Sequence, residues 1–146
     1  MHVSSKSRYA LRALVELDLR TGGEPRPVRI ADLASERDLP EQFLEQLFAT
    51  LRRAGLLRSH RGVGGGFTFA RRPDQVSVLD VVTALDGPLA VAACTEGECD
   101  LEEFCGASAV WRQASEAFEG VLAATSVADL AERERQLRAG QPMYQI

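Results

Sequence analysis

Apolar residues recur at helical spacing over most of the chain, and this pattern predicts a mainly α-helical protein. Residues 5–20 form the first amphipathic stretch, and a short helix is expected at 31–37 after an extended piece at 27–30. The clearest pattern covers residues 40–54. Its apolar residues repeat at i, i+3, i+4 and i+7 and form one face of a helix: Leu44, Leu47, Phe48 and Leu51.

Two short β-like runs follow, at 56–61 and 67–70, on either side of a glycine-rich turn at 62–66. Such a pair predicts a β-hairpin. The order of helix, short helix, turn, helix and hairpin is that of a winged helix-turn-helix domain. We therefore expect a fold that is mainly α, with a small β-wing and a long C-terminal helix.

The second half of the chain is predicted to hold three further helices around a loop. A capping box at Ser77 opens a helix that extends to about Leu85, a broad apolar stripe predicts a long helix at 107–124, and a last helix is expected at 127–138. These elements divide the chain into three parts. The predicted parts are the winged domain at 1–88, a loop at 89–106 and a helical end at 107–146.

Charge is divided unevenly between the two halves of the chain. The protein has 146 residues and a net charge of −4, which argues against nucleic acid because phosphate binding needs a positive surface. However, residues 1–72 carry 13 basic and 8 acidic groups, or +5, whereas residues 73–146 carry 4 and 13, or −9. The first half is therefore suited to an anionic partner, with chance scatter of surface charge as the alternative.

No segment resembles a signal peptide or a membrane span. The first apolar stretch is interrupted by Arg12, Glu16 and Asp18, and no stretch approaches the roughly 20 apolar residues of a spanning helix. We expect a cytoplasmic protein with no membrane partner. Its three cysteines, an odd number, argue against a framework of structural disulfides.

The helix at 40–54 is expected to read DNA. In helix-turn-helix proteins the first residues of the second helix contact base edges in the major groove, and here these are Gln42, Glu45 and Gln46. Glutamine pairs with adenine and glutamate accepts from cytosine. The predicted backbone contacts come from four arginines and two turn glycines: Arg52, Arg53, Arg58, Arg61, Gly64 and Gly65. Arg61 is also placed to enter the minor groove. The alternatives are a solvated helix face and a turn without a ligand.

Four segments carry familiar motifs. They are SSKSRYALRAL at 4–14, FLEQLF at 43–48, LRRAGL at 51–56 and RGVGGGF at 61–67. Together they resemble the iron–sulfur cluster regulator family over roughly residues 1–130. The resemblance implies a homodimeric transcription factor, acting as a repressor on a palindromic operator in double-stranded DNA. It also implies that the long helix at 107–124 crosses to the partner subunit. The match places Gln42, Glu45 and Gln46 at the recognition positions and Arg61 at the wing arginine.

Three cysteines gather in the loop: Cys94, Cys99 and Cys105 lie within twelve residues. Thiolates of this kind hold Fe–S clusters, so the predicted cofactor is a [2Fe–2S] or [4Fe–4S] cluster. Zinc is one alternative, although structural zinc sites usually have closely spaced cysteine pairs and four ligands. A redox thiol switch is another alternative, and cysteines without a function are the last.

The fourth ligand departs from the family pattern. IscR-type members place a histidine three residues after the last cysteine, where this chain has Ser108. NsrR-type members use an aspartate near the N-terminus, where this chain has Arg8, which cannot ligate iron. The remaining candidates are acidic loop residues, a serine, a histidine from the partner subunit, or a small molecule; the residues are Glu96, Glu98, Asp100, Glu102, Glu103, Ser108 and His2.

The expected function is therefore a DNA-binding regulator gated by a cluster that senses iron, redox state or nitric oxide. The alternative is a regulator without a cluster that is controlled by thiol oxidation or by a protein partner. The sequence contains no catalytic constellation and no fingerprint of an enzyme cofactor, so an enzyme is not expected.

Overall fold

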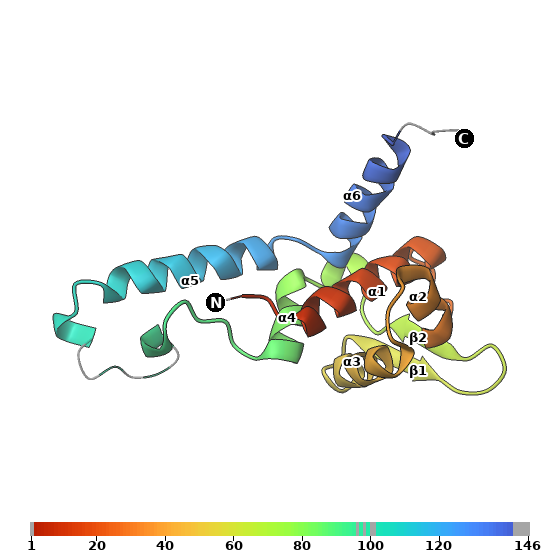
Figure 1. The fold of residues 1–146 in the computed structure, drawn as a ribbon, viewed down its shortest axis with the longest axis horizontal. Helices are drawn as coiled ribbons and strands as arrows, with labels where there is room; N and C mark the ends of the chain where they lie inside the picture. Colours follow the sequence, from red (N-terminus) through yellow and green to blue (C-terminus); the bar gives the residue numbers. More distant parts are fainter. Residues whose placement is uncertain (1, 96, 98, 100–101, 142–146) are drawn as a thin grey trace.

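The computed structural model describes residues 2–95, 97, 99 and 102–141 (Figure 1). Its regular elements are the helices α1 (Ser5–Thr21), α2 (Ile30–Arg37), α3 (Glu41–Arg53), α4 (Val78–Asp86), α5 (Ser108–Ala123) and α6 (Val127–Ala139), the strands β1 (Leu57–His60) and β2 (Gly66–Phe69), and the 3-10 turns η1 (Pro73–Gln75), η2 (Ala93–Thr95) and η3 (Glu102–Phe104). The predicted fold class, mainly α with a small β-wing and a long C-terminal helix, is confirmed.

The hydrophobic core is built around α1, which contributes Leu14 and Leu17, both fully buried. The four apolar residues predicted for α3 are also buried, none more than 4% exposed: Leu44, Leu47, Phe48 and Leu51. Because this stripe faces the core, the opposite, polar face of α3 points to solvent. From α6, Val127 and Ala131 complete the core at 0% exposure.

The wing (residues 57–69) is an antiparallel hairpin in which Leu57 pairs with Phe69 and His60 with Gly66. A third extended piece joins it, because Val28 and Phe67 exchange two backbone hydrogen bonds of 3.1 and 2.9 Å. The close approach requires glycine at position 66, since a Cβ atom there would lie 2.4 Å from the carbonyl oxygen of Val28. The segment between α1 and α2 is therefore fixed to the wing.

The two helices of the C-terminal part have different surroundings. Helix α5 extends away from the rest of the protein, whereas α6 lies against α1 (Figure 1). An ion pair of 2.7 Å between Glu134 and Arg37 also joins α6 to the end of α2. All residues of α5 are described, and none of them is buried. None of the helices in the described ranges has the length and apolar character needed to span a membrane.

Candidate DNA interface and cysteine loop

The polar face of α3 presents the predicted base-reading residues to solvent. Gln42, Glu45 and Gln46 are all exposed and lie off the buried stripe that contains Leu44 and Phe48. Amide and carboxylate groups at the start of a helix are suited to hydrogen bonds with base edges in a major groove. The geometry of α3 therefore agrees with a recognition helix.

The four predicted arginines lie on α3 and on the adjacent wing, and all four are exposed. The Arg52 guanidinium donates to the Ser59 hydroxyl at 3.2 Å, which ties the end of α3 to β1. The Arg53 guanidinium donates to the Thr50 hydroxyl at 3.2 Å. Arg58 projects from β1, and Arg61 follows the strand at the start of the turn. The structure thus brings these side chains together along α3 and the wing.

The turn of the wing depends on glycine conformations. Gly62 and Gly64 have φ angles of 88° and 78°, in the left-handed region that favours glycine. A Cβ atom at Gly65 would lie 2.4 Å from the carbonyl oxygen of His60. Between these glycines, Val63 is fully exposed at the tip. Gly64 and Gly65 therefore shape the turn that presents Arg61.

A carboxylate at the end of α4 ties the start of the cysteine loop to α1. Asp86 accepts hydrogen bonds from the Ser4 hydroxyl at 2.5 Å, the Ser4 backbone N–H at 3.2 Å and the Ser7 hydroxyl at 2.8 Å. Burial raises the pKa of Asp86, but the bonds from Ser4 and Ser7 and the charge of Lys6 outweigh it, and the pKa lies below its ordinary value. Sequence reasoning missed this contact, because Ser4 and Asp86 are 82 positions apart.

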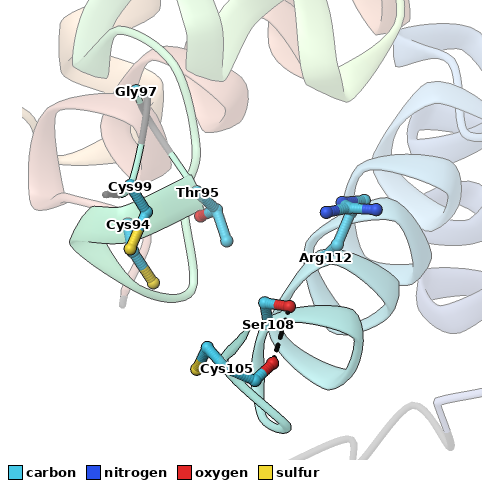
Figure 2. Close-up of a pocket in the computed structure, with 7 residues that line it drawn as sticks. All are labelled: Cys94, Thr95, Gly97, Cys99, Cys105, Ser108 and Arg112. Atoms are coloured by element: carbon cyan, nitrogen blue, oxygen red, sulfur yellow. Dashed lines mark hydrogen bonds between the residues drawn. The ribbon is translucent and has the colours of Figure 1, made fainter. Parts of the chain in front are cut away.

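The three predicted cysteines line one cavity of about 110 Å³. All three are free thiols; Cys94 is exposed, and Cys99 and Cys105 are partly buried. Figure 2 shows Cys94 and Cys99 on one side of the cavity and Cys105 on the other, beside Ser108 and Arg112. The cavity lies where the loop meets the first turn of α5. The structure thus brings the three predicted cysteines together around one cavity.

The donor chemistry of the cavity fits an Fe–S cluster, because thiolates are its usual ligands. The ligand geometry is not preassembled: among the described residues, no three His, Cys, Asp or Glu side chains are grouped so as to hold one metal ion. Ser108 lines the cavity and its hydroxyl donates to the Cys105 carbonyl at 2.9 Å, whereas Glu103 is exposed and His2 is exposed near the N-terminus. Three other candidate ligands lie outside the described residues: Glu96, Glu98 and Asp100. The side chain of the last candidate, Glu102, is not described either.

Sequence reasoning missed Arg112, which brings a positive charge to the cavity wall. Arg112 follows Ser108 by four residues, so the two side chains lie on the same face of α5. That spacing is a signal that the sequence contained. A cation on the wall of this cavity favours a negatively charged occupant, such as a cluster bound by thiolates.

Comparison with known proteins identifies the family. The Rrf2 family, described as iron-dependent transcriptional regulators, matches residues 3–133. The chain is 33% identical over 138 residues to the regulator IscR of Cronobacter sakazakii. The aligned residues cover 94% of this chain and 84% of that protein.

Solved structures that are similar to this one include an IscR and a CymR. IscR of T. potens has a TM-score of 0.76 and 32% identity, covering 99% of this chain and 97% of that one. CymR, described as the global cysteine regulator of B. subtilis, has a TM-score of 0.74 and 32% identity. That match covers 91% of this chain and 98% of CymR. These relatives are regulators and not enzymes, and the expected resemblance is confirmed. The chain belongs to the Rrf2 family of winged-helix transcriptional regulators.

Proposed function

We propose that this protein is a homodimeric regulator, acting as a repressor, whose affinity for a palindromic operator is controlled by an Fe–S cluster. Cys94, Cys99 and Cys105 would hold the cluster. The observation that carries the proposal is the shared cavity of these three thiols, which lies between the end of α4 and the start of α5. A chemical change at this position acts on the connection between the DNA-binding part and the long helix.

The proposed DNA contact follows from the exposed face of α3 and the wing. Gln42, Glu45 and Gln46 read bases in the major groove, and Arg61 enters the minor groove. The remaining predicted residues bind the DNA backbone: Arg52, Arg53, Arg58, Gly64 and Gly65. Because its partner is chromosomal DNA, we place the protein in the cytoplasm.

The proposed homodimer rests on the uncovered apolar face of α5. Val110, Trp111 and Val121 are 55%, 39% and 67% exposed. Large apolar side chains that follow one another along an exposed helix mark an interaction surface. A second copy is the fitting partner, since a palindromic operator presents two equal half-sites. The division into 1–88, 89–106 and 107–146 then separates DNA binding, sensing and dimerisation, while α6 packs back onto α1.

The proposed gating uses the chain's own connections. A bound cluster supplies a group that oxygen, nitric oxide or iron limitation can alter. The chain enters the cysteine loop three residues after Asp86, which ends α4 and is hydrogen-bonded to Ser4 and Ser7 of the DNA-binding part. A new loop conformation would therefore shift α5 relative to α4 and change the spacing of the two recognition helices. A dimer reads half-sites at a fixed spacing, so this shift weakens binding.

A second candidate is a thiol switch without a cluster. Two observations favour it: the described residues form no group of three metal ligands, and one similar structure is a cysteine regulator. In this alternative, two of the three thiols give up two electrons and two protons to an oxidant such as a peroxide and form a disulfide. The loop then changes conformation by the same route through α4 and α5.

Anaerobic native mass spectrometry separates the two candidates. The cluster proposal predicts a dimer whose mass includes one cluster per protomer, and Cys99→Ser protein that lacks it. An iron-free dimer after cluster reconstitution, which still binds DNA and releases it after peroxide treatment, would favour the thiol switch. If neither form bound any DNA duplex, both candidates would be wrong.

A further inference from the structure

A second basic surface lies beside the wing and is formed by arginines other than Arg52, Arg53, Arg58 and Arg61. Arg20, Arg26 and Arg29 line a cavity of about 430 Å³ whose opposite wall contains Gly64 and Gly65 of the wing turn. Arg26 and Arg29 come from the segment between α1 and α2, and both are exposed. The cavity therefore joins the glycine turn to a pair of exposed guanidinium groups.

The backbone fixes this pair in place next to the wing. Val28 lies between the two arginines, is 8% exposed, and pairs with Phe67 through two backbone hydrogen bonds. The extended piece at Val28 is thus a third strand-like edge beyond β2, while Arg58 lies on β1 at the other edge. Adjacent strands are about 4.8 Å apart, so the two edges are separated by roughly 10 Å.

This separation suits a wing placed in a minor groove. A minor groove is about 6 Å wide and has a sugar–phosphate strand on each side. Two edges that are roughly 10 Å apart therefore reach beyond the groove itself, to the strands that flank it. With Arg61 directed into the groove, as proposed above for the wing, Arg58 at one edge would face one strand. Arg26 and Arg29 at the other edge would then face the opposite strand.

The contacts that these arginines make within the protein leave donors for a phosphate. Arg26 donates one Nη2 bond to the backbone carbonyl of Arg20. Arg29 is 71% exposed and pairs with Asp32 at 3.3 Å, and exposed pairs of this kind contribute little to stability. Each guanidinium has five N–H donors. Arg20 differs, because it is held by Glu16 at 3.1 Å and by Glu36 at 3.6 Å, and it serves the fold.

We propose that Arg26 and Arg29 bind phosphates of the DNA strand on the far side of the wing. The proposal rests on the proposed DNA-binding function and adds a second backbone contact to it. Since phosphate contacts carry no sequence information, the two arginines strengthen binding to every duplex and position the wing in the groove.

The test is the salt dependence of DNA binding, measured by fluorescence anisotropy. Two duplexes serve as probes: one selected by the protein from a random-sequence library, and one of unrelated sequence. Each phosphate contact contributes about 0.9 to the slope of log K against log salt. The homodimer presents both arginines twice, so Arg26→Gln with Arg29→Gln lowers the slope by about 3.6 on both duplexes. Over a change from about 50 to about 200 mM salt, wild type then loses roughly 150-fold more affinity than the double variant.

Two variants control for net charge and for folding. Arg133→Gln removes one positive charge from an exposed position on α6 and leaves the slope unchanged. Arg26→Lys with Arg29→Lys keeps both charges and keeps a slope close to that of wild type, even where the melting temperature changes. If the double glutamine variant had the slope of wild type while wild type bound both duplexes, the phosphate proposal would be overturned. If wild type bound neither duplex, both the proposed DNA-binding function and the phosphate proposal would fail.

Discussion

Asp86 offers a sharp test of how the cysteine loop is connected to the DNA-binding part. The change is Asp86→Asn, which keeps the size of the side chain but removes its negative charge. In the structure this carboxylate accepts three hydrogen bonds from Ser4 and Ser7. The Ser4 hydroxyl also accepts from the Ser7 backbone N–H at 3.2 Å, as the N-cap of α1.

The expected loss of stability follows from these bonds. A hydrogen bond to a charged group contributes about 1.5–3 kcal/mol, and Asp86 is partly buried. Asparagine retains one acceptor, so we expect a net loss of about 2 kcal/mol in the free energy of unfolding. For a chain of this size that corresponds to a decrease in Tm of about 4–8 °C.

The pH dependence gives an independent check. Because the pKa of Asp86 is lowered in the folded protein, its stabilising effect is present above the unfolded pKa of about 3.9 and is lost as the pH falls through the folded pKa. The difference in stability between wild type and Asp86→Asn should therefore be constant between about pH 5 and pH 7 and shrink below about pH 4.

The assay is urea unfolding of the cluster-free protein, followed by far-UV circular dichroism at several pH values. Glu24→Gln is the matched control, since it removes one charge from an exposed loop position and should change the free energy of unfolding by less than about 0.5 kcal/mol. Equal stability of wild type and Asp86→Asn at pH 7 would refute the assigned role of the carboxylate.

Three further predictions concern the wing, the dimer and base reading. Gly66→Ala should destabilise the protein by about 2 kcal/mol or more in urea unfolding, because the new Cβ atom would lie 2.4 Å from the Val28 carbonyl oxygen; an unchanged midpoint would contradict the described approach. Val121→Asp should convert the dimer to monomers in sedimentation experiments, since it places a charge on the apolar face of α5, whereas the exposed Glu116→Gln should leave the dimer intact. Glu45→Ala should reduce discrimination at one base pair of the selected duplex by about 5- to 150-fold in competition binding, and retained discrimination would exclude Glu45 from base reading.

Local patterns in the sequence predicted the helices well. The helix expected at 40–54 is Glu41–Arg53, and the one expected at 107–124 is Ser108–Ala123. Both carry a regular apolar stripe, and the periodicity of such a stripe is set by neighbours within a few positions. The glycine-rich turn likewise identified the hairpin, since its conformation depends on residues adjacent in the chain.

Contacts between distant segments could not be predicted in the same way. The extended piece at 27–30 was expected, but its pairing with Phe67 depends on how α1 and α2 pack. The bonds between Asp86 and Ser4 likewise require α1 and α4 to be in place. For the cysteine site, spacing indicated the three thiols, whereas Arg112 joins them only because α5 begins where the loop ends.

The central claim is that the state of the cysteine site controls DNA binding. Its most direct test compares anaerobically purified protein that contains its cluster with the same preparation after cluster removal. Each is titrated by fluorescence anisotropy against a palindromic duplex at one salt concentration. Coupling between two sites typically changes affinity by about 5- to 150-fold, and we predict a difference in Kd within that range. Equal Kd values for the two forms would contradict gating by the cluster.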